Sequence, residues 1–129
     1  MPDKVLIIDD EPKEIFREIL EPEGFTVYLA DDGEEAFALM GAGPPDVVIL
    51  DLIMPKISGE EFLNRLKEKG YLSKIGIIVM TGFNDFDFTR KRLTANFPID
   101  AYLEKPVDSQ ELVEKVYLCL DKKKEREKQ

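Results

Sequence analysis

The stretch VVILDLIMPKISG, residues 47–59, decides the fold class. Its first four residues, 47–50, are apolar and run directly into an acid, Asp51, and no residue of opposite charge follows before Lys56. A continuous apolar run is typical of a central strand that is buried on both faces of a parallel sheet. An uncompensated carboxylate beside such a strand is costly to desolvate. Asp51 therefore either lies at an exposed strand end or has a partner that compensates its charge.

Other short apolar runs alternate with amphipathic segments along the whole chain. They predict further strands at residues 4–8, 26–30, 75–80 and 100–103. Three of the intervening segments begin with capping-box spacing, and residues 84–97 predict a short, marginal helix. The capping pairs are Asp32 with Glu35, Ser58 with Glu61, and Asp108 with Glu111. Five strands alternating with five helices predict an α/β fold around a parallel sheet.

Composition limits the function classes. The chain has 129 residues, enough for one domain with its own core, and a formal net charge of −9. This balance argues against nucleic-acid binding by the domain, because phosphate backbones need a basic face. No apolar run approaches the roughly 20 residues of a membrane span, and no signal peptide is visible, so we expect no membrane partner and a cytoplasmic location. The single cysteine, Cys119, excludes an internal disulfide framework and is interpreted as a small core residue.

Residues with chemical functions follow the predicted strands. Asp9 and Asp10 follow the first strand, Asp51 the third, Thr81 the fourth and Lys105 the fifth. In parallel α/β sheets, ligands bind outside the carboxyl ends of the strands. We therefore expect these side chains to share one pocket.

Three close carboxylates repel one another and raise at least one pKa unless a cation lies among them. Their hard oxygen ligands suit Mg²⁺ or Ca²⁺. Lys105 adds a positive charge and Thr81 a hydroxyl donor. A metal, an ammonium and a hydroxyl together are suited to holding phosphoryl oxygens.

Several segments resemble the receiver domain of two-component response regulators, the family that includes the single-domain chemotaxis regulator. The matching segments are VLIIDDEP, GFTVYLADDGEEAF, DVVILDLIMPKISG, IIVMTG and DAYLEKP. The resemblance extends from about residue 3 to residue 120. It implies a flavodoxin-like, doubly wound sheet of five parallel strands in the order 2-1-3-4-5, flanked by five helices. We expect a receiver domain over residues 1–121, followed by a polar helix end or linker over 122–129.

The resemblance implies that Asp51 is the phosphoacceptor, which takes a phosphoryl group from a sensor histidine kinase or a phosphotransfer protein. This is covalent carboxylate chemistry. Mg²⁺ would be held by Asp10, Asp51 and the backbone carbonyl of Ile53, with Asp9 acting mostly through a metal-bound water. The protein would be a signalling module rather than an enzyme, with only self-phosphorylation from phosphodonors and autodephosphorylation.

The remaining roles concern the response to phosphorylation. Lys105 would pair with Asp51 at rest and with a phosphoryl oxygen afterwards, and the bond to Pro106 would be cis. Thr81 would move to bond the phosphoryl group, and Tyr102 would swing inward behind it. The face formed by the fourth helix, fifth strand and fifth helix would then signal to an output partner or domain whose identity the sequence leaves open.

Two positions beside the phosphoryl site depart from the commoner family pattern. Ile53 and Phe83, each two residues after a site residue, are apolar, whereas polar residues there can orient a hydrolytic water. We therefore predict a long-lived phosphorylated Asp51.

Three alternative functions have weaker support in the sequence. A haloacid-dehalogenase-type phosphatase needs a second acid two residues after its nucleophile, where Ile53 stands. A nucleotide- or flavin-binding module lacks its Gly-rich loop, because the first strand is followed by DDEPKE. A degenerate receiver that acts only as an interaction scaffold is disfavoured by the intact set of acids, threonine and lysine.

Overall fold

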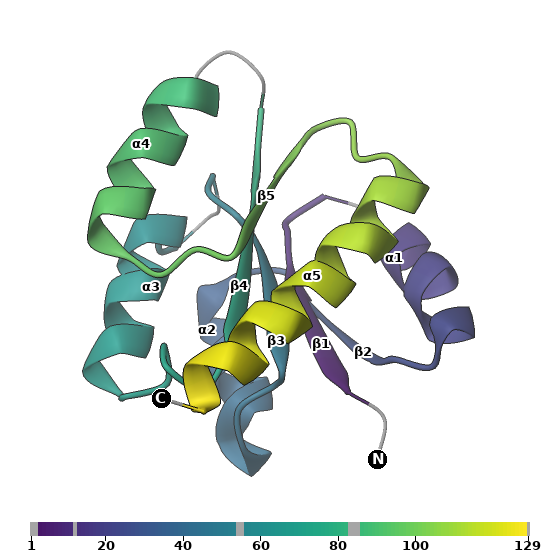
Figure 1. Ribbon diagram of the computed structural model, residues 1–129, viewed down its shortest axis with the longest axis horizontal. Helices are drawn as coiled ribbons and strands as arrows, with labels where there is room; N and C mark the ends of the chain where they lie inside the picture. The colour runs from purple at the N-terminus through teal and green to yellow at the C-terminus, as the bar shows by residue number, and fades with distance from the viewer. Residues whose placement is uncertain (1–2, 12, 54–55, 83–85, 129) are drawn as a thin grey trace.

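The computed structural model describes residues 3–128 except 12, 54–55 and 83–85, and it leaves the side chains of 86–89 undescribed. Its centre is a parallel sheet with the strand order β2-β1-β3-β4-β5 (Figure 1). The predicted sheet and its order are therefore confirmed. The strands are β1 (Lys4–Ile8), β2 (Thr26–Ala30), β3 (Val47–Asp51), β4 (Gly76–Thr81) and β5 (Ala101–Glu104).

Five α-helices flank the sheet, with α1 and α5 on one face and α2, α3 and α4 on the other (Figure 1). Short 3₁₀ turns follow the first two helices, at Glu21–Glu23 and Met40–Ala42. The helix that sequence predicts as marginal is formed, and Leu93 is fully buried within it. The helices are α1 (Glu14–Leu20), α2 (Gly33–Leu39), α3 (Gly59–Glu68), α4 (Phe86–Asn96) and α5 (Ser109–Glu127).

Side-chain caps fix the beginnings of three helices. The carboxylate of Asp32 accepts a hydrogen bond from the backbone N–H of Glu35 at 2.8 Å. At the start of α5, the carboxylate of Asp108 accepts the corresponding backbone hydrogen bond at 2.9 Å. The Ser58 hydroxyl accepts from the N–H of Glu61 at 3.1 Å. Each bond satisfies a backbone donor that the first turn leaves without an intrahelical partner, so the predicted helix starts are confirmed.

The sheet separates two hydrophobic clusters. Leu6 and Ile8 of β1 pack with the residues of α2, α3 and α4, whereas Val5 and Ile7 pack with those of α1 and α5. Successive side chains of a strand point to opposite faces. The apolar runs of the central strands are therefore continuous because both of their faces are buried.

The polar C-terminal part of α5 is bonded to the end of the sheet where the strands begin, opposite their carboxyl ends. Asp100 is buried, accepts a hydrogen bond from the N–H of Ile77 at 2.9 Å and forms an ion pair with Arg126. The Lys122 ammonium donates to the Asp100 carbonyl at 2.8 Å. The helix continues to Glu127, so residues 122–127 extend α5. None of the helices in the described part of the chain is long and apolar enough to cross a bilayer.

Candidate functional site

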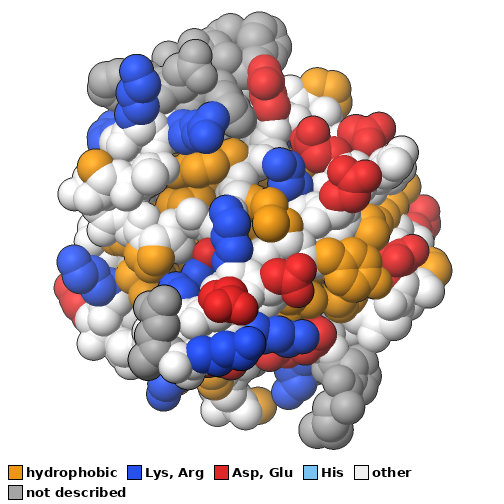
Figure 2. All heavy atoms as spheres, in the orientation of Figure 1, with side chains coloured by type: hydrophobic (Ala, Val, Ile, Leu, Met, Phe, Trp, Pro, Cys, Tyr) orange, Lys and Arg blue, Asp and Glu red, His pale blue; other side chains and the backbone are white. Residues whose placement is uncertain are grey.

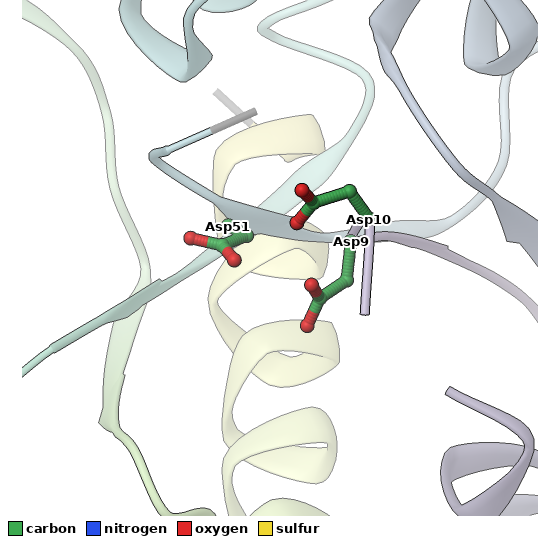
Figure 3. A group of neighbouring side chains, drawn as sticks. All are labelled: Asp9, Asp10 and Asp51. Carbon is green, nitrogen blue, oxygen red and sulfur yellow. The ribbon is translucent and has the colours of Figure 1, made fainter. Parts of the chain in front are cut away.

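Three carboxylates meet where β1 and β3 end. Asp9 and Asp10 follow β1, and Asp51 is the last residue of β3. The two strands pair in parallel, so their carboxyl ends are adjacent. One carboxylate oxygen from each acid lies within 4.8 Å of the others (Figure 3). Asp9 and Asp51 are buried and Asp10 is exposed, which leaves the group open to solvent on one side.

Lys105 compensates two of these acids. Its Nζ atom lies 2.7 Å from Oδ2 of Asp51 and 3.1 Å from Oδ2 of Asp9. The lysine directly follows β5 and precedes Pro106 through the expected cis bond. The sequence predicted the pair with Asp51 and missed the bond to Asp9, because strand order alone does not determine how far a lysine side chain reaches.

Backbone amides hold the other oxygens of the two buried acids. The N–H of Glu11 donates to Oδ1 of Asp9 at 3.0 Å, and the N–H of Ile53 donates to Oδ1 of Asp51 at 3.1 Å. Each carboxylate is thus oriented by the backbone two residues later. The Ile53 side chain is 83% exposed. Phe83, the other apolar residue predicted beside the site, lies outside the described residues.

Burial and Lys105 have opposite effects on the pKa of Asp51. Burial raises the pKa of Asp51, the bonds from Lys105 and from the Ile53 amide lower it, and burial outweighs them. Burial alone would lower the pKa of Lys105, but its bonds to Asp51 and Asp9 outweigh that effect and raise it. Among the described residues, three carboxylates face the Lys105 ammonium, so negative charge remains in excess. Closely spaced oxygen ligands with excess negative charge fit a divalent cation such as Mg²⁺.

Thr81 lies at the end of β4, beside Lys105. Its carbonyl accepts a hydrogen bond from the backbone N–H of Lys105 at 2.9 Å. The side chain is buried, and its Oγ1 atom has no hydrogen-bond partner within the described part of the chain. A buried hydroxyl without a partner is unusual in native proteins, because such a group costs free energy to desolvate.

Tyr102 of β5 is bonded to α4. Its hydroxyl lies 2.8 Å from Oγ1 of Thr94 and donates to the carbonyl of Arg90 at 3.2 Å. Burial raises the pKa of Tyr102, although the bond to Thr94 and the Arg90 charge lower it. The sequence missed Thr94, because a threonine at an exposed helical position gives no signal of a cross-element bond.

The profile of the response regulator receiver domain matches residues 5–117 of this chain. The chain belongs to this family. A receiver domain is a module of two-component signalling and not a catalytic enzyme family. The match therefore favours the receiver interpretation over the phosphatase and nucleotide-binding alternatives.

Comparison with curated proteins gives the same family relationship. The response regulator MprA of Mycolicibacterium vanbaalenii is 34% identical over 122 residues, which cover 93% of this receiver domain and 51% of MprA. The sensor histidine kinase TmoS of Ectopseudomonas mendocina is 35% identical over 111 residues, covering 84% of the chain and 11% of TmoS. The receiver domain thus spans about half of one relative and about a tenth of the other.

Two solved receivers match nearly the whole chain. A response regulator receiver domain protein from Clostridium thermocellum is 30% identical with a TM-score of 0.80, covering 95% of this chain and 97% of that one. A CheY-like receiver from Methanospirillum hungatei is 27% identical with a TM-score of 0.81, covering 97% and 98%. The acidic group of Asp9, Asp10 and Asp51 therefore lies on a receiver fold.

Proposed function

We propose that Asp51 is the phosphoacceptor of this receiver domain and that transfer to it depends on Mg²⁺. The observation that carries the proposal is the placement of the Asp51 carboxylate between Lys105, at 2.7 Å, and the acids Asp9 and Asp10. One oxygen of Asp51 bonds to the Ile53 amide and the other to Lys105. The nucleophile is thus fixed in orientation before a donor arrives, which lowers the entropy cost of the reaction.

In the proposed reaction, an Asp51 oxygen attacks the phosphorus atom of a phosphohistidine. The O–P bond forms, the P–N bond breaks, and the leaving imidazole keeps the bonding electron pair and takes up a proton. The Lys105 ammonium moves from the Asp51 oxygen to a phosphoryl oxygen. It thereby compensates the charge that the phosphoryl group brings into the site.

Asp9, Asp10, Asp51 and the Ile53 carbonyl are the groups that would hold Mg²⁺. When bound, the ion neutralises charge on the phosphoryl oxygens and orients them. Asp10 is exposed and Asp51 is buried, so this set offers both an entry side and an inner ligand. Asp9 is bonded to Lys105 and to the Glu11 amide, which supports an indirect contribution through a metal-bound water.

The response would begin at Thr81. Its buried hydroxyl lacks a partner in the described chain, and it would donate to the new phosphoryl group. Tyr102 would then give up its bonds to α4 and move inward, which changes the face formed by α4, β5 and α5. Phosphorylation would shift the population between two states of this face.

We propose a sensor histidine kinase or a phosphotransfer protein as the donor. Both kinds of relative support this, since one is named a response regulator and the other a sensor histidine kinase. A cytoplasmic location, and a receiver over residues 1–121 followed by a polar extension over 122–129, are parts of the same proposal.

The test is adduct formation. Wild-type protein, Asp51→Asn and the control Asp121→Asn, which changes an exposed acid of α5, are treated with acetyl phosphate with and without Mg²⁺. We expect intact-mass analysis to show one phosphoryl group on the wild type and the control, only with Mg²⁺, and none on Asp51→Asn. No adduct on the wild type would support the scaffold reading instead. An equal adduct on Asp51→Asn would move the acceptor to another residue.

A further inference from the structure

The loop between β3 and α3 carries the Ile53 carbonyl, and an ion pair bonds the later part of this loop to α2. The Nζ atom of Lys56 lies 3.2 Å from Oδ2 of Asp32, which is the N-cap residue of α2. The Asp32 side chain is 10% exposed and that of Lys56 58%. Solvent and salt screen a partly buried pair less than a fully exposed one. The loop is therefore held by charge to the start of a different helix.

Two further contacts hold the same loop. Ile57 is buried, and a Cβ atom added at Gly33, the first residue of α2, would overlap its side chain. The N–H of Gly59 donates a hydrogen bond to the carbonyl of Leu52 at 3.0 Å, which joins the two ends of the loop. An apolar contact thus lies next to the ion pair, and both attach the loop to the start of α2.

The backbone of Lys56 has an unusual conformation. Its φ angle is 70°, in the left-handed region that side chains with a Cβ atom rarely adopt. No other non-glycine residue in the described part of the chain has a positive φ. Such a conformation is costly and persists only where the surrounding contacts enforce it. The loop is therefore constrained at the same residue whose side chain reaches Asp32.

The turn after β2 is also bonded to the loop after β1. Asp31 forms an ion pair with Lys13, whose side chain is 13% exposed. The N–H of Asp9 donates a hydrogen bond to the carbonyl of Ala30 at 3.1 Å. The consecutive acids Asp31 and Asp32 therefore connect the two loops that supply the candidate metal ligands, one after β1 and one after β3.

We propose that Lys56 is a positioning residue for the metal site. Its pair with Asp32 fixes the loop that carries the Ile53 carbonyl, and it thereby sets the affinity of the resting site for Mg²⁺. The inference rests on the proposed function, in which the acidic group holds this ion. Mg²⁺ demands a nearly ideal octahedral arrangement of its ligands. Groups that orient metal ligands without touching the ion therefore change the metal affinity.

Charge alone would have a different effect from positioning. The chain has a net charge of −9, and Figure 2 shows Asp and Glu side chains gathered near the beginning of α5, with Lys and Arg side chains over α4 and along the later turns of α5. Through the electrostatic field, loss of a cation strengthens Mg²⁺ binding and loss of an acid weakens it. Loss of either partner of the Lys56–Asp32 pair releases the loop, so positioning predicts weaker binding in both cases.

The test is an NMR titration of the metal-free, ¹⁵N-labelled chain with MgCl₂ at constant ionic strength. The proteins are the wild type, Lys56→Met, Asp32→Asn, the double variant and Lys56→Arg. Asn still caps a helix, so Asp32→Asn removes the charge and keeps the start of α2. We expect both single variants and the double variant to bind Mg²⁺ about three- to fivefold more weakly than the wild type, by the same factor. Lys56→Arg keeps the pair and should stay within about twofold of the wild type.

The matched control is Glu61→Gln/Arg65→Met. It removes an ion pair that lies within α3 and is partly exposed on both sides, so its Kd should change by less than about twofold. The amide spectra of the metal-free proteins report structural damage. Shifts confined to the β3–α3 loop and the start of α2 support the proposal, whereas shifts spread over the whole sheet in Lys56→Met would assign the pair a general structural role and overturn it.

Three patterns of Mg²⁺ affinity would also overturn the proposal. Tighter binding by Lys56→Met together with weaker binding by Asp32→Asn would assign the effect to the electrostatic field. Recovery of the wild-type Kd in the double variant would show that a freed Lys56 ammonium competes with Mg²⁺. Equal Kd values in the wild type and both single variants would leave the pair without a role at the metal site.

The positioning proposal and the phosphoacceptor proposal fail in different ways. If acetyl phosphate modifies Asp51 at saturating Mg²⁺ and the Kd values do not differ, the positioning proposal fails alone. If the Kd values follow the expected pattern but no adduct forms, the phosphoacceptor proposal fails and the positioning role of Lys56 stands. A wild type that does not bind Mg²⁺ would overturn the positioning proposal and the Mg²⁺ dependence of phosphorylation together.

Discussion

The Nζ atom of Lys105 lies 2.7 Å from Oδ2 of Asp51, a residue 54 positions earlier in the chain. Both side chains are mostly buried, with exposed fractions of 25% and 11%. In this pair, the lysine compensates the charge of an acid that the central strand places at the carboxyl end of the sheet. Removal of Lys105 would leave the Asp51 carboxylate without this compensation, so the ionised site depends on the lysine.

Mg²⁺ is expected to stabilise the protein against unfolding. A ligand that binds only the folded state contributes about 2.7 kcal/mol at 100 times its Kd, which a thermal melt reports as a higher Tm. Asp10→Asn removes the exposed ligand and should reduce the Mg²⁺-dependent rise in Tm, whereas Glu11→Gln, at the adjacent exposed position, should not. Identical melting of the wild type with and without Mg²⁺ would contradict the metal site.

Asp51→Asn is expected to stabilise the metal-free protein at neutral pH. Burial raises the pKa of Asp51 despite Lys105, so the folded state disfavours the ionised carboxylate. The neutral amide avoids that cost, by on the order of 1 kcal/mol. Because the folded pKa is the higher one, the cost is complete above it and vanishes as the pH falls through it toward the unfolded value near 3.8.

Chemical denaturation of the wild type and Asp51→Asn across this pH range measures the difference. The two proteins should converge in free energy of unfolding at low pH. If the wild type were instead more stable than Asp51→Asn at neutral pH and lost that advantage as the pH fell, Lys105 would outweigh burial.

Ile53 is expected to prolong the life of a phosphorylated Asp51. Its side chain is 83% exposed, so a polar replacement fits without repacking the core. We expect Ile53→Asn to speed loss of the phosphoryl group at least about tenfold by orienting water, and Ile53→Leu to leave it slow. Intact mass followed over time after removal of the phosphodonor gives both rates. Loss from the wild type within seconds would contradict this prediction.

Much of the fold was predictable because its signals are local. The apolar runs of β1, β3 and β4 and the caps at Asp32, Ser58 and Asp108 each depend on a few neighbouring residues. Grouping of the strand-end acids followed from parallel topology. The resemblance to receivers added the strand order and the residue roles.

The contacts that the sequence did not predict are made by side chains that extend from one helix or strand to another. Lys105 bonds to Asp9 over 96 positions, and Tyr102 bonds to Thr94 on α4. Asp100 was predicted only as the start of a strand, yet it is a buried acid that binds the end of α5. No periodicity encodes such pairs, because any exposed polar residue of α4 or α5 has the same pattern.

Gly76→Ala is expected to destabilise the protein by about 1–3 kcal/mol. A Cβ atom at Gly76 would overlap the Sγ atom of Cys119, which is fully buried on α5. Gly41→Ala is the control, because nothing lies within 4 Å of its added Cβ. Urea denaturation gives the free energies of unfolding.

Cys119→Ala removes the clashing sulfur, so a double-mutant cycle should show Gly76→Ala costing less in that background. Equal cost in both backgrounds would locate the strain elsewhere.

Arg126→Met is expected to cost about 3 kcal/mol of stability, because it leaves the buried Asp100 without its cationic partner. The matched control is Lys128→Met. Lys128 pairs with Glu125 while both side chains are more than 70% exposed, so its loss should change stability by less than about 0.5 kcal/mol. Asp100→Asn should recover part of the loss in the Arg126→Met background. Equal effects of the two single variants on the denaturation midpoint would contradict a structural role for the end of α5.

The division of the core by the sheet has a thermodynamic consequence at its β5 edge. Tyr102 packs against the cluster of α2, α3 and α4, whereas its neighbour Leu103 belongs to the cluster of α1 and α5. A ligand bound across this edge contacts elements from both clusters at once. Coupling between two sites is reciprocal. If beryllofluoride at Asp51 tightens the binding of an output partner by some factor, that partner must tighten the binding of beryllofluoride by the same factor, and it thereby holds the receiver in its active state.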